Sequence, residues 1–148
     1  MGMIADSMVD EWDSSLPKTD GIYSLIEKTM DSRSPKVRIW AITSLGNSGD
    51  PRAVRSLIDC CQDQSPEIRL CAIEGLQSLR SGRAVDVLIE RLRDKDELPK
   101  TRLRAAAALA TIRSFGAIRE LKNRHADPDE DGALRTFIGG ELDRVKIW

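Results

Sequence analysis

Between positions 34 and 45 the apolar residues follow a helical pattern. Val37, Ala41 and Leu45 recur every fourth residue, which places them on one face of an α-helix and does not fit the alternation of a β-strand. Ser34-Pro35 suits the start of this helix, because a serine caps free N–H groups and a proline has none to leave unpaired. We therefore predict a helix that begins here.

A second helix is predicted directly after the first. The run 46–49 contains two glycines and is typical of a helix end, and Asp50-Pro51 is a start signal. The two helices form an antiparallel pair joined by a tight turn. The predicted apolar face of the second helix consists of Ala53, Val54, Leu57, Ile58 and Cys61.

This helix pair recurs along the chain. The segment that starts at Ser34-Pro35 is matched at Ser65-Pro66 and again at Leu98-Pro99. A fixed period of about 20 to 50 residues is typical of solenoids, in which a unit buries its apolar face only by stacking on its neighbours. We predict an all-α fold, an α-solenoid that forms a superhelical stack of antiparallel helix pairs. Its single domain at 17–148 would hold units at about 34–64, 65–97 and 98–127, with partial capping helices at 20–30 and 132–146.

The repeated unit resembles a known family. From Pro35 to Leu57 the chain reads Pro-x-Val-Arg-x-x-Ala-x-x-x-Leu-Gly-x-x-Gly-Asp-Pro-Arg-Ala-Val-x-x-Leu, which is similar to a HEAT repeat. More narrowly, it resembles the short HEAT-like repeats named after phycobilin lyase subunits. The resemblance extends over about residues 20–142. It implies a stack of HEAT-like helix pairs that acts as a curved binding surface.

An arginine occupies the same position in each unit, at Arg38, Arg69 and Arg102. These residues could form a ladder that binds an anion. They could also bridge to carbonyl or carboxylate groups of the adjacent helix pair, using the fixed fork of donors in the guanidinium group. Because they recur at a position between units, we favour the structural role.

The charge distribution and the cysteine content indicate the environment in which the protein works. The net charge of −1 divides into −4 for residues 1–34, +6 for 35–126 and −3 for 127–148. No segment has the length and apolar character of a transmembrane helix.

The odd set Cys60, Cys61 and Cys71 fits a reducing compartment, so we expect a cytoplasmic protein. We interpret these cysteines as small buried hydrophobic residues, with reactive thiols or bilin ligands as the alternative.

Few residues suit catalysis or metal binding. His125 is the one histidine, and no cysteine pair has zinc spacing. HEAT-type metalloenzymes that hydroxylate a lysine derivative hold iron through repeated His-Glu pairs, which this sequence lacks. We therefore expect no catalytic residue, no metal site and no cofactor, and a protein that is not an enzyme.

The candidate binding residues lie on the polar side of the second helices, which the resemblance places along the concave face. With the apolar positions turned inward, two rows of side chains point outward. They carry charges of both signs, which favours a protein partner over a nucleic acid, since the latter would need a continuous basic stripe. The rows are Tyr23, Arg55, Asp86 and Arg119, and Glu27, Asp59, Glu90 and Asn123.

The acidic N-terminal segment 1–16 has two interpretations. Ile4, Met8 and Trp12 have helical spacing, which predicts a docking helix, while the short acidic composition also fits a flexible tail. Self-association could use this segment or the end helices.

We conclude from the sequence that the chain is a non-catalytic scaffold, a protein–protein interaction module that binds a protein partner through the ridge of its second helices. Two alternatives remain. The resemblance implies an accessory subunit of a bilin-lyase-type enzyme, and the basic middle of the chain motivates a nucleic-acid binder, which is the less favoured of the two.

Overall fold

The computed structural model describes residues 21–31 and 33–145, and every regular element in these ranges is helical. The predicted all-α solenoid is confirmed. Along the chain the helices are α2 (Ile22–Lys28), α3 (Pro35–Asn47), η1 (Pro51–Ala53), α4 (Val54–Cys60), α5 (Pro66–Leu79), η2 (Gly82–Ala84), α6 (Val85–Arg93), α7 (Pro99–Ile112), α8 (Phe115–Ala126) and α9 (Gly132–Val145).

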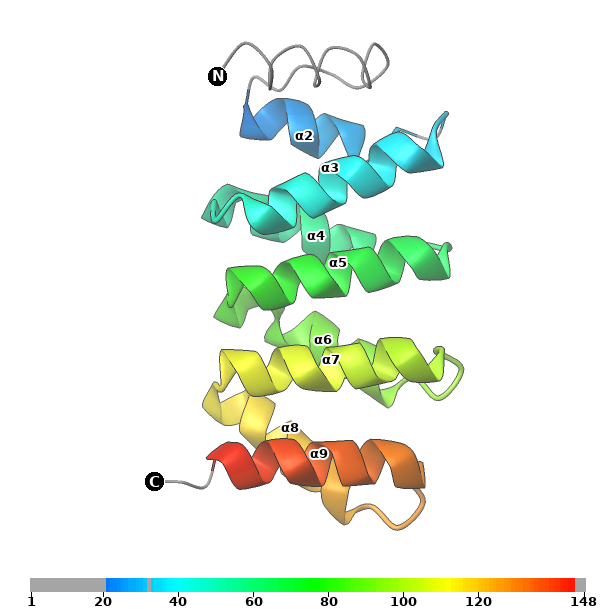
Figure 1. The fold of residues 1–148 in the computed structure, drawn as a ribbon, viewed down its shortest axis with the longest axis vertical. Helices are drawn as coiled ribbons and strands as arrows, with labels where there is room; N and C mark the ends of the chain where they lie inside the picture. The colour runs from blue at the N-terminus through cyan, green and yellow to red at the C-terminus, as the bar shows by residue number, and fades with distance from the viewer. Residues whose placement is uncertain (1–20, 32, 146–148) are drawn as a thin grey trace, which may run out of the picture.

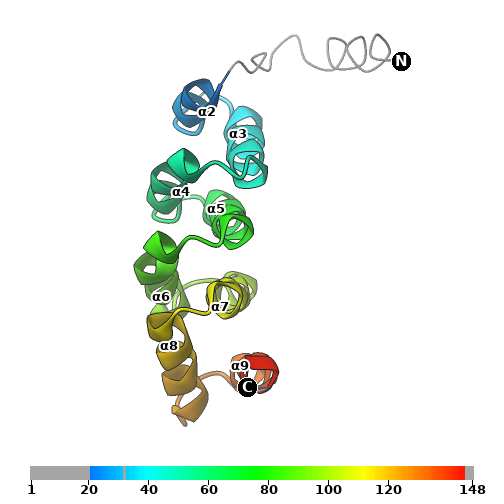
Figure 2. The same ribbon diagram turned by 90° about the vertical axis from the view of Figure 1, so that its left-hand side faces the viewer.

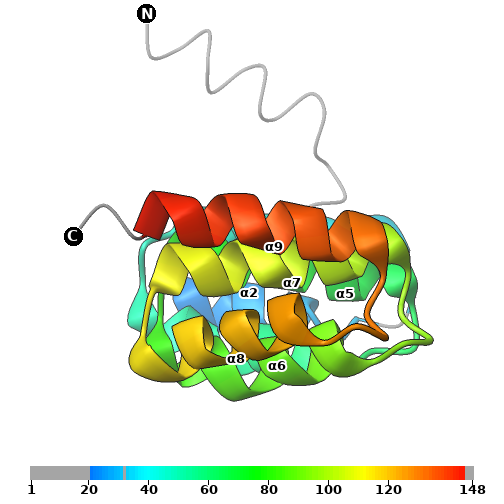
Figure 3. The ribbon, with the colours of Figure 1, turned by 90° about the horizontal axis from the view of Figure 1, so that it is seen from below.

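The helices form two layers. The A layer contains α3, α5, α7 and α9, and the B layer contains α2, α4, α6 and α8 (Figure 2). Seen along the stack, α7 and α9 lie on one side and α6 and α8 on the other (Figure 3). Successive A helices contact one another, and each A helix contacts the B helix that precedes it in the chain. This is the stacking that a repeat unit needs in order to bury its apolar face.

The A helices run in the same direction, so their C-terminal ends share one edge of the stack, on the left in Figure 1. We call this the turn edge, because it carries the turns within each helix pair, around positions 48–53, 80–84 and 113–115. The opposite edge carries the loops between pairs, around 60–65, 94–98 and 127–131, and we call it the loop edge.

Helix starts agree with the capping residues. The side chain of Ser34 accepts the N–H of Val37 at 3.3 Å, and a proline follows in the first turn of α3. The second helix of this unit departs from the prediction at its start. Asp50 accepts the N–H of Arg52 at 2.9 Å, but the chain first makes the 3-10 turn η1, and the α-helix begins only at Val54.

The predicted helix end at 46–49 is partly wrong. Helix α3 continues through Asn47, and Gly46 is a buried residue of that helix. A Cβ atom at Gly46 would lie 2.6 Å from the Cα of Gly75 in α5, so Gly46 serves close packing of two A helices. The turn conformation is taken by Gly49, whose φ is 67°.

The hydrophobic core runs through the whole stack between the layers. Leucine and isoleucine side chains from both layers fill it and are fully buried. These are Ile42, Leu45, Leu57, Ile73, Leu76, Leu88, Leu92, Leu109, Leu121 and Ile138. Ile58, predicted to be buried, is only partly so.

Among the described residues, no helix combines the length and the apolar composition that crossing a membrane requires. The docking helix or tail predicted for 1–16 lies outside the described residues.

Candidate functional site

The eight predicted binding residues are all exposed and belong to the B layer. Each of the four B helices contributes two of them, one helical turn apart. We call this surface the B face, and its members are Tyr23 and Glu27 on α2, Arg55 and Asp59 on α4, Asp86 and Glu90 on α6, and Arg119 and Asn123 on α8.

Interactions within the B face are few and exposed. Arg55 Nε lies 3.5 Å from Asp59 Oδ1, with the two side chains 77% and 57% exposed. Gln62 Nε2 donates to Glu90 Oε2 at 3.1 Å. Exposed pairs of this kind contribute little to stability. The side chain of Asp86 makes no hydrogen bond or ion pair with any other residue that the structure describes, so it remains open to a ligand.

Two exposed aromatic rings, that of Tyr23 on the B face and that of Phe115 beside it, each lie under an arginine. The guanidinium carbon of Arg52 lies 5.2 Å from the centroid of the Tyr23 ring, and that of Arg119 lies 5.6 Å from the ring of Phe115. Phe115 is 82% exposed and was missed by reasoning from the sequence. A signal was present, because this phenylalanine takes the position that Pro51 has in the first unit. Exposed aromatic rings under arginines are suited to contacts with a partner.

The recurring arginines connect successive units at the loop edge. Arg38 Nε donates to the carbonyl oxygen of Thr29 at 2.7 Å, and its Nη2 donates to Asp63 Oδ1 at 2.7 Å. Arg69 donates to both carboxylate oxygens of Glu97, at 2.8 and 2.9 Å, and to the carbonyl oxygen of Asp63 at 2.8 Å.

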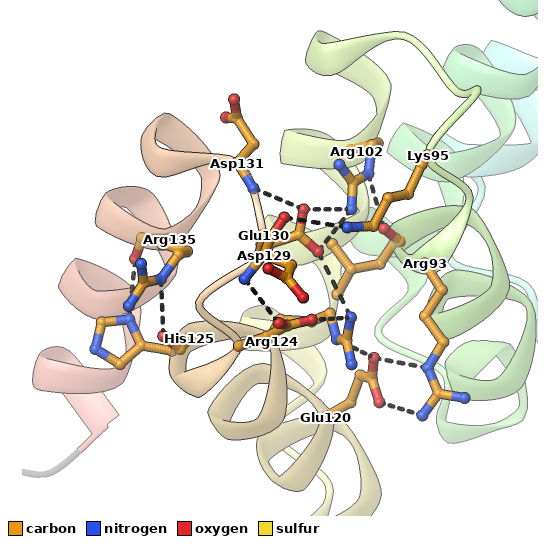
Figure 4. Close-up of polar contacts among 12 residues, drawn as sticks. Arg93, Lys95, Arg102, Glu120, Arg124, His125, Asp129, Glu130, Asp131 and Arg135 are labelled. Carbon is orange, nitrogen blue, oxygen red and sulfur yellow. Dashed lines mark hydrogen bonds and ion pairs between the residues drawn. The ribbon is translucent and has the colours of Figure 1, made fainter.

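Arg102 repeats this arrangement in the third unit (Figure 4). Its Nε donates to the carbonyl oxygen of Leu92 at 2.8 Å, and its Nη2 lies 2.8 Å from each carboxylate oxygen of Glu130. Arg102 and Glu130 are 7% and 5% exposed. The predicted structural role of the three arginines is confirmed, because each guanidinium spans two loop-edge segments.

The environment of the partner carboxylates keeps them ionised. Burial by itself would raise the pKa of Glu97, but hydrogen bonds from Arg69 and from the N–H of Leu98 lower that pKa overall. The same balance lowers the pKa of Asp63, beside Arg38, and the pKa of Glu130, beside Arg102.

Further charges extend this network between α6 and α8. Arg93 Nε donates to Glu120 Oε2 at 2.9 Å, and Arg124 Nη1 lies 3.6 Å from Glu130 Oε2 (Figure 4). A cavity of about 380 Å³ adjoins the pair Arg102–Glu130. The charges of that buried pair are satisfied by each other, so the cavity offers a ligand no open buried charge.

The cysteines are not placed for reactivity. Cys60 and Cys61 are buried, while Cys71 is partly exposed. Burial raises the pKa of Cys61 to about 12, and it also raises the pKa values of Cys60 and Cys71. A thiolate is the reactive and ligating form of cysteine, and it is disfavoured at all three positions.

The histidine does not belong to a metal site. His125 Nδ1 lies 3.0 Å from the carbonyl oxygen of Arg135, at the contact of α8 with α9. Within 21–31 and 33–145, no group of three or more His, Cys, Asp or Glu side chains is arranged to hold a metal ion. With one histidine in the sequence, the residues do not fit an iron site of repeated His-Glu pairs.

Comparison with solved structures gives a likeness to an enzyme. Human deoxyhypusine hydroxylase, solved in complex with glycerol, is similar with a TM-score of 0.75 and 25% sequence identity. The alignment covers 86% of this chain and 44% of that chain, so this chain spans less than half the length of the hydroxylase. A comparison with curated proteins found no match.

This likeness corrects the expectation about function. We expected a non-catalytic interaction module and a protein that is not an enzyme, with a bilin-lyase accessory subunit or a nucleic-acid binder as alternatives. The structural likeness to a hydroxylase contradicts that expectation. The expectation rested on the catalytic residue types that the sequence lacks. The likeness to the hydroxylase lies in the fold, which the apolar repeat encodes and which those residue types do not affect.

The family follows from the repeats themselves. The family model of HEAT repeats matches residues 22–110, which is more than half of the chain. The matched range runs from α2 into α7 and includes the arginines Arg38, Arg69 and Arg102. The chain belongs to the HEAT-repeat family.

Proposed function

We propose that this chain binds a polypeptide substrate as part of an enzyme and holds it along the B face. The likeness to a hydroxylase supports the enzymatic setting, and the HEAT repeats support a protein as the bound molecule. The chain aligns with less than half of that hydroxylase, so we propose a share in the enzyme and name no catalytic residue.

The observation that carries this proposal is the regular display of open side chains on the B helices. Four successive helices each present two exposed residues, which together comprise four acidic and two basic side chains, one tyrosine and one asparagine. A polypeptide offers charges of both signs together with main-chain donors and acceptors, so its chemistry is complementary to such a surface. The loop edge is less suited, because its arginines Arg38, Arg69 and Arg102 are already paired.

The binding part can be tested by affinity capture from a lysate of the source organism, followed by mass spectrometry. The test variant is Arg55→Glu/Asp86→Arg/Arg119→Glu, which reverses three exposed charges of the B face. The matched control is Lys36→Glu/Glu67→Arg/Lys100→Glu, which reverses the same pattern of charges at exposed positions of the A layer.

We expect the wild type and the control to retain a partner that the B-face variant loses, with all three proteins melting cooperatively. A partner held equally by all three would contradict the B face as the binding surface. The enzymatic part is tested by adding each protein and the captured partner to a lysate of the source organism that lacks this chain, which supplies the rest of the enzyme, and recording peptide masses. We expect a covalent mass change with the wild type and the control, and an unchanged partner would contradict the enzymatic setting.

A further inference from the structure

Three arginines gather at the turn edge, on the side of the stack away from the buried ion pairs. Arg80 follows α5, Arg113 follows α7, and Arg144 lies in the last turn of α9. Together with Thr111 and Glu141 they line a pocket of about 330 Å³ at the C-terminal ends of these three A helices. The pocket is formed by three successive units, so it exists only in the stacked array.

The charges in this pocket are largely unpaired. Arg144 Nη1 lies 3.3 Å from Glu141 Oε1, and the Arg144 side chain is 75% exposed. Neither Arg80 nor Arg113 makes an ion pair with another residue in the part of the chain that the structure describes. The lining therefore holds two open guanidinium groups and a third that shares the partly buried carboxylate of Glu141, which is an excess of positive charge.

The backbone at Arg80 and Arg113 is unfavourable for arginine. Both residues adopt the left-handed conformation, with φ values of 53° and 59°. The first unit places Gly49 at the equivalent position, with a φ of 67°, and glycine is the residue that takes this conformation without steric strain. A cation elsewhere in the last turn would interact with the helix dipole just as well, so the dipole does not account for arginine at the strained position. A ligand that needs these side chains does account for it.

We propose that this pocket binds the carboxylate groups of an acidic polypeptide segment. Guanidinium groups pair with carboxylates through two parallel hydrogen bonds, and three of them around one pocket suit neighbouring Asp or Glu side chains. The pocket gathers its three guanidinium groups in a compact space, whereas a nucleic acid would need a longer, continuous basic stripe. This inference rests on the proposed function in that the bound molecule is again a polypeptide, but it uses a different surface.

The test uses the full chain and a fluorescently labelled peptide of eight alternating Asp and Glu residues, with anisotropy as the signal at about 0.15 M salt, where the screening length is about 8 Å. The variant Arg80→Gly/Arg113→Gly removes both open guanidinium groups and relieves the backbone strain. We expect it to bind the peptide at least about tenfold more weakly than the wild type, because charge-assisted hydrogen bonds are lost. We expect its melting temperature to equal or exceed that of the wild type.

Two further variants show whether a loss of peptide binding comes from the missing guanidinium groups of the pocket. Arg80→Asn/Arg113→Asn retains a residue that tolerates the left-handed conformation, and we expect the same loss of binding. Arg55→Gln/Arg119→Gln removes two positive charges from the B face, and we expect binding within about twofold of the wild type, because salt screens exposed charges beyond about 8 Å. This control separates the pocket from the B face, because a failure of the proposed function would leave peptide binding in the pocket intact.

Three outcomes would overturn the inference. Equal peptide binding by the wild type and both pocket variants would show that the arginines are not the binding groups. Earlier melting of both pocket variants would show that the arginines serve the fold. A labelled single-stranded DNA of the same length that binds tighter than the peptide and displaces it would assign the pocket to a nucleic acid.

Discussion

Arginine has three different roles in this chain, and its surroundings decide which one applies. At the loop edge, Arg69 and Arg102 are largely buried and donate to carboxylates and carbonyls of neighbouring segments. On the B face, Arg55 is exposed and pairs only loosely with Asp59. At the turn edge, Arg80 and Arg113 sit in a strained backbone conformation beside a pocket. Buried, paired guanidinium groups hold units together, whereas exposed ones remain available to a ligand.

The buried pair Arg102–Glu130 yields a prediction about single residues. Replacing Arg102 by Met leaves the Glu130 carboxylate buried without its partner, and we expect the free energy of unfolding in urea to fall by about 3–5 kcal/mol. The double variant Arg102→Met/Glu130→Met removes both charges and should recover much of that loss. Arg55→Met serves as the exposed control and should leave the urea midpoint unchanged. An Arg102→Met protein as stable as the control would contradict the structural role.

The helices of the A layer set how closely the units stack. Gly46 in α3 faces Gly75 in α5, and the missing side chains let the two backbones approach. Gly140 in α9 is different, because a Cβ atom there would meet nothing within 4 Å. Glycine in a helix lowers stability unless close packing requires it, so the two positions should respond in opposite directions.

We therefore predict opposite effects for the same substitution. Gly46→Ala should lower the free energy of unfolding by about 1–3 kcal/mol, because α3 and α5 must separate to admit the methyl group. Gly140→Ala should raise it by about 0.5–1 kcal/mol through helix propensity alone. Chemical unfolding monitored by circular dichroism measures both. Stabilisation by both substitutions would mean that the A helices are not in close contact at Gly46.

The sequence predicted some parts of the candidate site and not others. The outward positions of the B helices, such as Arg55 and Asp86, follow from helical periodicity and are exposed as expected. The partners of the recurring arginines were not predictable. They lie 25, 28 and 28 residues further along the chain, and the two later loops each hold several acidic residues, so the sequence does not single out the one that pairs. The pocket of Arg80, Arg113 and Arg144 combines three units and has no signal in any one of them.

At the scale of the whole molecule, stability depends on the same kind of contact repeated at each junction. Three arginine–carboxylate pairs, made by Asp63, Glu97 and Glu130, tie the first turns of α3, α5 and α7 to the loops that lead into the following A helices. In a stack of repeats, total stability is close to the sum of unit and junction contributions. A change that affects every junction at once should therefore act on the molecule as a whole.

Acidification is such a change. The pKa values of Asp63, Glu97 and Glu130 lie below the ordinary values of 3.8 for aspartate and 4.5 for glutamate. Because the folded pKa is lowered, these groups contribute stability above the ordinary value, and this contribution is lost as the pH falls toward the lower, folded value. We predict that the free energy of unfolding declines from about pH 4.5 downward. In Asp63→Asn/Glu97→Gln/Glu130→Gln that decline should be shallower, and an identical slope would contradict the role of these carboxylates.

The helices, their pairing and the repeat follow from the sequence alone, because helical periodicity and capping are local properties that neighbouring residues fix. So does the exposed side of each B helix. The folded arrangement alone sets which groups far apart in the chain meet: Arg69 with Glu97, Gly46 with Gly75, and the arginines of the turn edge with one another. These contacts depend on the shift and rotation from one unit to the next. That geometry results from the packing of whole helices, so no single segment of the chain encodes it.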